Sequence, residues 1–315
     1  MSNSADKIDL QVQVATLYYR ENLSQQEIAQ KLNMSRPTIS RILRSCTEEG
    51  IVSIHIKNVS TQQYDLAKQV KKKYELKHVS VVSASGDKGK ILSGIGSEAA
   101  AYLLSSVRQD TRIGISAGIT VSHMIDYLKP IYNYNVGIYQ LQGDASHQID
   151  TCSSFLCTEI AKRLHAKAHG MHVPLLVNTK VLRDLLLEEP FNKKHFQELD
   201  NLDMAFVGLG LVDSIIASRS DNWYIVNRDR EILKSLNVAG DLCGNFIDCD
   251  GNQCQAEISD HTISISLEVL KTCKNCVAVA AGIEKRKIAR AALKSKLISS
   301  LIIDESLATA LLAGD

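Results

Sequence analysis

The chain has 315 residues, with 36 Lys and Arg against 35 Asp and Glu, and 45% of its residues are hydrophobic. This length allows about one to three domains, and the apolar content excludes a globally disordered chain. A net charge of +1 excludes a protein whose whole surface is basic, so any contact with nucleic acid must come from a local patch.

Three features of the sequence predict a cytoplasmic protein with no membrane partner. Charged or amide side chains interrupt every apolar run well before the ~18 residues that a membrane span needs. The first six residues lack the apolar stretch of a signal peptide. Eight cysteines in 315 residues are too few for a disulfide scaffold, so we expect reduced thiols.

The N-terminal 57 residues have the apolar spacing of helices. Ser24 and Glu27 match a capping box, in which each side chain binds the other residue's backbone N–H, and this predicts that a helix begins there. Ser35 is expected to cap the next helix, with Pro37 in its first turn. Asn33 is expected in the turn between them. Asn tolerates the left-handed backbone of a tight turn better than most residues.

Two short helices joined by a tight turn pack stably only if certain positions are apolar and one is small. Ala29 is the small residue at the expected helix crossing. The apolar positions are Ile28, Leu32, Met34, Ile39 and Ile42. This is the pattern of a helix-turn-helix. A helix over residues 8–20 would complete its core, and an alternating stretch at residues 51–56 would add a wing strand.

The exposed residues of the second helix are basic or hydroxylated, and there is no acidic residue from Ser35 to Arg44. Arg binds guanine or phosphate in a bidentate manner, and Thr and Ser reach base edges or backbone oxygens. We therefore expect this helix to lie in the major groove of DNA. Its candidate DNA-binding residues are Arg36, Thr38, Ser40, Arg41 and Arg44. The alternative is a small protein-binding module with solvated arginines.

Residues 61–76 contain neither Gly nor Pro, and Tyr64, Ala67, Val70 and Tyr74 recur at helical spacing. They predict one helix with a narrow apolar seam, in a linker over residues 58–77. It would join a DNA-binding domain over residues 1–57 to a larger domain over residues 78–315. The helix either packs on its own domain or pairs with a second subunit, and the sequence favours neither alternative.

From residue 79 onward, short β-rich runs alternate with helical patterns. The expected strands are residues 79–83, 112–116, 136–141, 204–209, 277–281 and 301–303. Strands separated by helices need crossover connections, so the sequence predicts an α/β domain with a mostly parallel sheet. In such a sheet, ligands bind beyond the carboxyl ends of the strands.

Several loops are expected at that edge. Ser116, Gly118 and Thr120 follow the second strand and open a helix, whose N-terminus favours an anion. An aspartate can accept hydrogen bonds from sugar hydroxyls, and a lysine can pair with a phosphate. The other candidates at the edge are Gln142, Gly143, Asp144, Gly208, Gly210, Asp241 and Lys285. Taken singly, each is better explained as a turn glycine, a helix cap or a solvated charge.

Taken in order, these motifs resemble those of the SorC family of bacterial sugar-binding transcriptional regulators, over essentially the whole chain. The segments that carry the resemblance are residues 17–19, 24–29, 35–41, 208–210, 238–241 and 280–282. The resemblance implies a winged helix-turn-helix joined to an effector domain of sugar-phosphate isomerase-like fold. It also implies a homo-oligomer, commonly a tetramer built as a dimer of dimers. Its binding to double-stranded operator DNA would respond to a phosphorylated sugar.

By position, the resemblance places the phosphate loop at Ser116, Gly118 and Thr120 and the hydroxyl and phosphate contacts at Asp241 and Lys285. Some relatives carry a Lys in the loop of Gln142 that can form a Schiff base with an aldehyde sugar. Gln has no amine that could do so, and covalent capture is not expected here.

The alternative function is a sugar-phosphate isomerase or deaminase that carries a DNA-binding arm. Such an enzyme needs a carboxylate and a His at the loop of Gly208 and Gly210 to move protons. Residues 208–214 contain no His. We therefore expect binding without turnover, and no cofactor or metal. A scaffold that binds only protein is disfavoured by the arginines of the second helix.

Four further motifs carry weaker signals. Gly94 and Gly96 resemble a dinucleotide fingerprint but do not follow a strand directly, so we interpret them as a helix start. The spacing of His165, His169 and His172 suggests a metal site, yet Gly170 is expected to end the helix that would align them.

A lone CxxC at Cys273 and Cys276 predicts reduced thiols, with a regulatory disulfide as the minor alternative. Residues 248–252 hint at a calcium loop whose ligands are out of register. An Asp-Gly turn between short strands at residues 246–248 and 253–258 explains them better.

Overall fold

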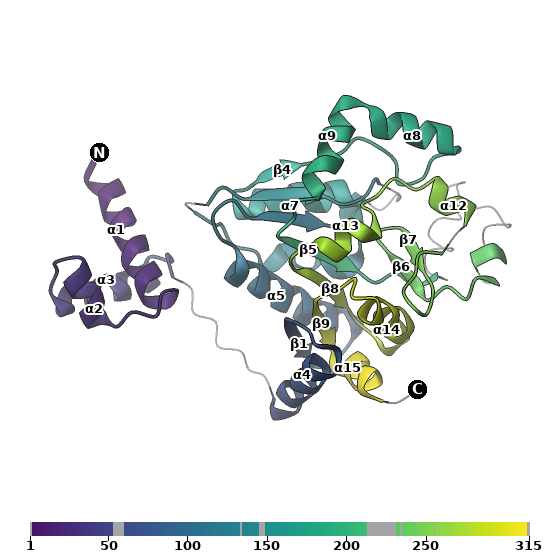
Figure 1. Cartoon of the computed structure of the whole chain (residues 1–315). Coiled ribbons are helices and arrows are strands. Elements are labelled where there is room, and N and C mark those ends of the chain that lie inside the picture. The colour runs from purple at the N-terminus through teal and green to yellow at the C-terminus, as the bar shows by residue number, and fades with distance from the viewer. Residues whose placement is uncertain are drawn as a thin grey trace. The chain divides into compact units, whose positions relative to one another are not determined.

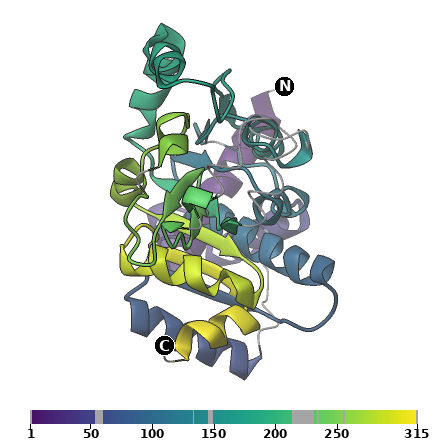
Figure 2. The same cartoon turned by 90° about the vertical axis from the view of Figure 1, so that its right-hand side faces the viewer.

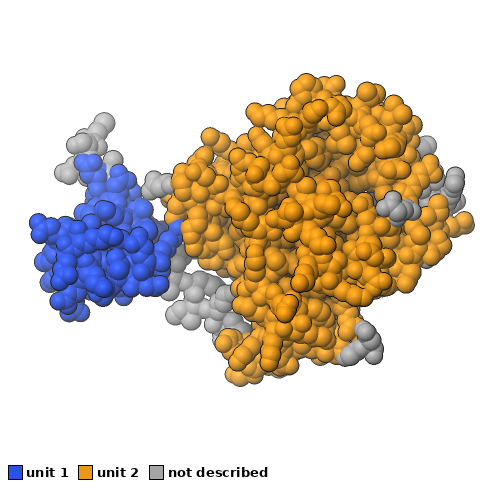
Figure 3. Space-filling model, in the orientation of Figure 1, with its two compact units in different colours: residues 1–58 blue, residues 59–315 orange. Residues whose placement is uncertain are grey.

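The computed structural model describes residues 2–52, 60–132, 134–144, 149–212, 231–233, 235–254 and 256–313. The chain divides into two compact units, residues 1–58 and 59–315 (Figure 3). Each unit has its own hydrophobic core, and each is described by itself.

The N-terminal unit is a three-helix bundle that contains the predicted helix-turn-helix (Figure 1). Its helices are α1 (Ser2–Tyr19), α2 (Gln25–Lys31) and α3 (Arg36–Glu48). The capping box is confirmed: the backbone N–H of Ser24 donates to Oε2 of Glu27 at 2.7 Å, and the N–H of Glu27 donates to Oγ of Ser24 at 3.3 Å. Asn33 adopts the expected left-handed backbone, with a φ of 50°.

The core of this unit follows the predicted register closely. Ile28, Ala29 and Ile39 are buried, and Leu32, Met34 and Ile42 pack against them. On α1 the deepest residue is Val14, which the sequence analysis did not single out. The predicted wing strand falls mostly outside the described residues, which stop at residue 52 and resume at residue 60.

The second unit is built on a seven-stranded sheet in which every neighbouring pair is parallel, as the sequence predicts. The strand order is β1-β9-β8-β5-β2-β3-β4. The strands are β1 (His78–Val82), β2 (Arg112–Ile115), β3 (Gly137–Gln140), β4 (Lys167–His169), β5 (Met204–Gly208), β8 (Cys276–Ala280) and β9 (Ser300–Asp304). The edge strand β4 was not predicted, because three residues are too few to show alternation.

Helices cover both faces of this sheet (Figures 1 and 2). One face is covered by α5 (Lys88–Ser106), α6 (Ile119–Ser122) and α7 (Ser153–Leu164). The opposite face is covered by α4 (Thr61–Tyr74), α9 (Pro190–Leu199), α13 (Leu267–Thr272), α14 (Arg286–Lys294) and α15 (Glu305–Leu312). The central strands are buried on both faces, as in β8, where all five residues are buried. Near-continuous apolar runs are typical of such strands.

Shorter elements complete the unit. They are η1 (Ile125–Tyr127), η2 (Ile149–Thr151), α8 (Lys180–Glu188), β6 (Gly240–Leu242), β7 (Asn245–Ile247), α12 (Glu257–Asp260) and η3 (Ile283–Lys285). Strands β6 and β7 form an antiparallel hairpin. The strand expected over residues 253–258 is wrong. Gln253 makes a single bridge to Ile247, and the chain then turns into α12, which buries Ile258.

Helix α4 belongs to the second unit and packs against β1 and α15. Val70 is fully buried there, and the hydroxyl of Tyr74 donates to the carbonyl of Leu311 at 2.9 Å. The predicted seam is rotated slightly: Leu66 packs inward, and Tyr64 is 64% exposed.

The expectation that a helix starts at Gly94 is wrong. Helix α5 begins at Lys88, where the side chain of Asp87 accepts a hydrogen bond from the N–H of Lys90 at 2.9 Å. Gly94 and Gly96 therefore lie inside the helix. A Cβ atom built on Gly96 would lie 2.2 Å from the carbonyl oxygen of His123, so this glycine permits close contact between two backbones.

Gly94 and Gly96 of α5 should respond oppositely to substitution by alanine. Gly96→Ala should lower the free energy of unfolding by ~1–3 kcal/mol, because backbone must move to admit the methyl group. Gly94→Ala should raise it by up to ~1 kcal/mol, because its Cβ would meet Val82 at an ordinary 3.6 Å while helix propensity improves. Chemical denaturation followed by circular dichroism measures both. Equal effects of the two variants would contradict this account of the packing.

Candidate effector site and DNA-contacting helix

The order of the strands reverses between β2 and β5. From β2 the chain continues to β3 and β4 on one side, whereas β5 lies on the other side and leads to β8 and β9. Ligands of open parallel sheets bind at such a reversal, because the connections leave in opposite directions and open a crevice. Here the Oγ of Ser116, after β2, accepts a hydrogen bond from the N–H of Gly208 at 3.1 Å. Ser116 and Gly208 are thus brought together as predicted.

Ser116 organises the loop after β2 from within the protein. Its side chain is buried, and its hydroxyl donates to the carbonyl of Ala117 at 3.0 Å while accepting from Gly208. Gly118 has a φ of 141°, and apart from its two chain neighbours no atom of the described residues lies within 4 Å of the position its Cβ would take. Thr120 lies in the first turn of α6, a helix that no side chain caps. The first N–H groups of α6 therefore face the same edge as Gly118.

Gly210, Asp241 and Lys285 form a second group. Gly210 and Asp241 exchange two backbone hydrogen bonds, of 3.0 and 3.1 Å. Asp241 is 7% exposed, and its Oδ2 accepts from the N–H of Gly244 at 2.7 Å. The ammonium of Lys285 donates to the carbonyl of Leu209. Burial lowers the pKa of Lys285, while the nearby carboxylates of Asp241 and Glu284 act in the opposite direction.

The loop that carries Lys285 is held by a carboxylate of the next strand. Asp304, at the end of β9, is 1% exposed. Its Oδ2 accepts from the N–H of Gly282, and its Oδ1 accepts from the N–H of Leu307 at 2.9 Å in the first turn of α15. One side chain therefore fixes both the site loop and the last helix.

Gln142, Gly143 and Asp144 extend from β3, and the structure explains them mainly through packing. Gln142 is buried, and its backbone forms an isolated antiparallel β-bridge with Ser264. A Cβ on Gly143 would lie 2.4 Å from the carbonyl oxygen of Pro174, so glycine is needed there for a close crossing of two chain segments. Oδ1 of Asp144 accepts from the N–H of Ser154 at 3.1 Å, in the first turn of α7.

Two buried side chains, Gln140 and His195, hold the backbone at the start of the loop after β3. The Nε2–H of His195 donates to the carbonyl of Gln140 at 2.8 Å. The side chain of Gln140 donates to the carbonyl of Gln142 at 2.8 Å and accepts from the N–H of Met171 at 2.9 Å. Burial lowers the pKa of His195, and its hydrogen bond to Gln140 opposes this shift. His195 is therefore best accommodated as a neutral imidazole.

Sequence reasoning missed Asp304, Gln140 and His195. Asp304 carried a usable signal, because it directly follows an apolar strand and precedes a helix that needs a cap. Gln140 and His195 carried none, since Gln140 accepts from the backbone of Met171 and His195 donates to the backbone of Gln140, and both pairs are distant in the sequence.

On α3, the predicted DNA-binding side chains differ in whether they already interact with other side chains of the protein. Arg36, Ser40 and Arg41 are exposed. Thr38 Oγ1 lies 2.7 Å from Oγ of the cap residue Ser35. Arg44 forms an ion pair of 3.0 Å with Glu48, one turn along the helix. Among the described residues, the positive charge of α3 is thus least compensated at Arg36 and Arg41.

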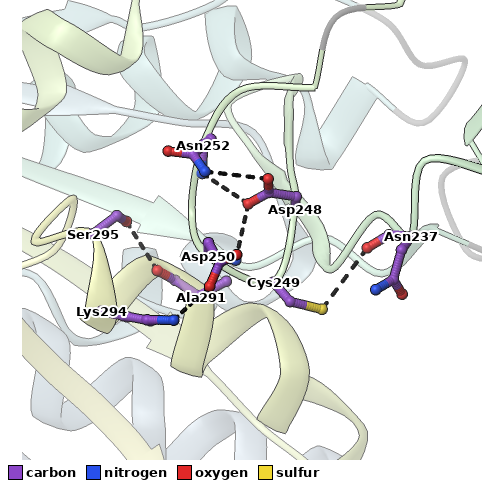
Figure 4. Close-up of polar contacts among 8 residues, drawn as sticks. All are labelled: Asn237, Asp248, Cys249, Asp250, Asn252, Ala291, Lys294 and Ser295. Atoms are coloured by element: carbon purple, nitrogen blue, oxygen red, sulfur yellow. Dashed lines mark hydrogen bonds and ion pairs between the residues drawn. The ribbon is translucent and has the colours of Figure 1, made fainter.

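The calcium-loop motif is a self-contained turn (Figure 4). Oδ1 of Asp248 accepts from the N–H groups of Asp250 and Asn252, each at 2.9 Å, and the carboxylate of Asp250 pairs with Lys294. A Cβ on Gly251 would lie 2.3 Å from Oγ of Ser295. These carboxylates already serve protein donors, and the Asp-Gly turn is confirmed.

The remaining motifs also have structural explanations. Helix α7 ends at Leu164, before Gly170, and His165 follows it with a left-handed backbone. His169 stacks on Tyr139, and His172 stacks on Phe191. In the part of the chain that the structure describes, no three His, Cys, Asp or Glu residues are grouped to hold a metal ion. Cys273 and Cys276 are free thiols whose pKa values are raised by burial. No described helix is both long and apolar enough to cross a membrane.

Comparison with known proteins agrees with both units. Residues 59–313 match the family model described as "Putative sugar-binding domain", and residues 15–53 match "Winged helix-turn-helix DNA-binding". The sorbitol operon regulator of Klebsiella pneumoniae is 30% identical, over 99% of this chain and 100% of its own. The deoxyribonucleoside regulator of Bacillus subtilis is 28% identical, over 97% and 98%. The crystal structure of the full-length Klebsiella protein, SorC, superposes with a TM-score of 0.77 at 28% identity, over 97% of this chain and 99% of that one.

The chain belongs to the SorC family. Both the recognition and the fold class predicted from the sequence are confirmed by these matches. As a SorC-family member that joins a winged helix-turn-helix to a sugar-binding domain, the protein is a DNA-binding transcriptional regulator.

The buried His195 should make stability depend on pH. Because its folded pKa is lowered, the unfolded chain binds a proton first as the pH falls below about 6.5. The free energy of unfolding should therefore decrease from pH 7.5 to pH 5.5. His195→Gln removes the titrating group, so its unfolding free energy should fall less steeply over this range. Denaturation at several pH values measures both slopes, and identical slopes would contradict the role assigned to His195.

Proposed function

We propose that this regulator binds double-stranded operator DNA through α3, and that a phosphorylated sugar controls this binding from the carboxyl edge of the sheet. The observation that carries the proposal is the position of Lys285. This half-buried cation lies near Asp241 and donates to the strand-end carbonyl of Leu209, next to the point where the strand order reverses.

Two kinds of group at this edge match the two parts of such a ligand. The free N–H groups at the start of α6, the open backbone at Gly118 and the ammonium of Lys285 suit a phosphate. Asp241 suits sugar hydroxyls, because a carboxylate accepts hydrogen bonds. We assign Ser116, Gly143, Asp144, Gly208 and Gly210 to shaping these loops. Thr120 is assigned to the ligand-facing edge, and the buried Gln142 is assigned to supporting the loop after β3.

Carbohydrate control is supported by two relatives, which are named for sorbitol and for deoxyribonucleosides. Binding without turnover is supported by the carboxylates themselves. Asp144 and Asp241 already accept backbone N–H bonds, and a general base must instead be free to take up a proton.

A homo-oligomer, specifically a tetramer built as a dimer of dimers, would present pairs of recognition helices to DNA. Two such helices read successive major grooves when they lie ~34 Å apart, or a multiple of that distance. Sugar binding must then favour one arrangement, by up to ~5.5 kcal/mol for a shift from 1:99 to 99:1.

Replacing Lys285 tests the effector site. Lys285→Ala should abolish the rise in melting temperature that a phosphorylated sugar produces, because the anion loses its cation, while DNA affinity stays unchanged. A thermal-shift screen with phosphorylated sugars on the wild-type protein identifies the ligand. The same screen with the unphosphorylated sugars is the control. A full thermal response in Lys285→Ala would remove this lysine from the site.

Replacing the arginines of α3 tests the DNA contact. Arg41→Ala should weaken binding to the operator, measured by fluorescence anisotropy, by ~1–3 kcal/mol. Arg44→Ala should have a smaller effect, because Glu48 already compensates this charge. Unchanged affinity in Arg41→Ala would contradict the assignment of α3 as the recognition helix.

A further inference from the structure

Helices α8 and α9 expose an unusual number of large apolar side chains. Val181, Leu182, Leu185 and Phe191 are 69%, 43%, 63% and 60% exposed. Five of the nine residues of α8 are aliphatic, and none of them is buried. A helix this short is marginal in water unless an apolar face packs against something.

The inner side of α8 is attached to its own unit. Leu186 and Leu187 pack against a small cluster around Val173 and Ile263, and Nε of Arg183 donates to the carbonyl of Thr262 at 3.0 Å. Val181 and Leu185 are one helical turn apart and lie on the other side. Both views of the molecule show α8 and α9 at the periphery of the α/β unit (Figures 1 and 2).

The order of charges along α8 is unfavourable for the dipole of the helix. Lys180 and Arg183 lie in its first half, and Glu188 and Glu189 lie at its end, although a helix favours acids at its start and bases at its end. In an antiparallel pair of α8 helices, Lys180 of one copy would lie near Glu188 and Glu189 of the other. The charge order that is unfavourable in a single helix therefore becomes complementary in a symmetric pair.

The composition of the surface disfavours nucleic acid as its partner. Residues 180–199 contain four basic and four acidic residues. Lys180 pairs with Asp184 at 3.4 Å, and Lys193 pairs with Glu188 at 2.6 Å, so the apolar residues are flanked by charges that compensate one another. An apolar centre with a polar rim is the usual composition of an interface between protein subunits.

We propose that α8 packs against α8 of a second copy of this chain in an antiparallel, two-fold symmetric contact, with Leu185 near its two-fold axis and Val181 toward its end. This inference rests on the homo-oligomer of the proposed function and names one of its surfaces. A standard interface buries ~800 Å² on each partner, which is more than an apolar patch of four side chains supplies. The flanking charges of α8 and residues of α9 complete it.

Leu185→Asp tests the contact, with Tyr132→Asp as the matched control. Both side chains are similarly exposed, 63% and 66%, so neither is needed for folding of the single chain. Sedimentation velocity without DNA or sugar should show the assembly reduced to half its mass in Leu185→Asp and unchanged in Tyr132→Asp. Circular dichroism checks that both variants are folded.

A wild-type mass in Leu185→Asp would overturn the proposed surface while leaving the homo-oligomer intact. A wild-type protein that sediments as a single chain would overturn both. Neither outcome depends on the DNA-contacting or effector residues, because neither ligand is present in the measurement.

Cross-linking provides a second test that does not rely on disruption. In a Cys249→Ser background, which removes the exposed thiol, Leu185→Cys should give a disulfide-linked dimer under mild oxidation, because residue 185 lies close to the two-fold axis of this register. Tyr132→Cys is the control and should not. The absence of a linked dimer from Leu185→Cys would contradict the symmetric contact.

Discussion

The reversal of strand order between β2 and β5 is the constraint on which the effector site depends. All seven strands are parallel, so their carboxyl ends meet at one edge, and the reversal separates the connections exactly where Ser116 and Gly208 lie. The hydrogen bond between these two residues holds the two halves of the edge together. The loops after β3 and β8 are then fixed by their neighbours in the sheet, and residues from distant parts of the sequence meet at one edge.

A second constraint is the partial burial of a positive charge at that edge. Removing Lys285 from water disfavours its charged form, and the carbonyl of Leu209 and the carboxylate of Asp241 oppose this cost. Such an arrangement suits an anionic ligand, because the anion compensates a charge that the protein alone compensates only in part. Gly240 directly precedes Asp241, and a Cβ on it would lie 2.4 Å from the carbonyl oxygen of Gly210, so the position of Asp241 is tied to the packing of the unit.

Much of the architecture was predictable because it depends on local rules. Alternating strands and helices indicated the parallel sheet, and Ser24, Glu27 and Asn33 indicated the helix-turn-helix through capping and turn geometry. Prediction failed where long-range contacts decide the outcome. Position 96 in the middle of a helix needs a glycine because the backbone near His123 passes close to it, and the sequence does not reveal this contact. Strand β4 is too short to show periodicity. Within the site, loop positions followed from the strands, but the supporting roles of Asp304, Gln140 and His195 required the three-dimensional structure. The pairing of Arg44 with Glu48 was detectable from their spacing of four residues.

The two carboxylate oxygens of Asp304 accept hydrogen bonds from two different elements, and this connects those elements. The side chain joins the loop of Lys285 to the first turn of α15, and the end of α15 in turn receives the hydroxyl of Tyr74 from α4. A displacement of the Gly282 loop is therefore passed by the carboxylate of Asp304 to α15 and, through the hydroxyl of Tyr74, to α4 of the same unit.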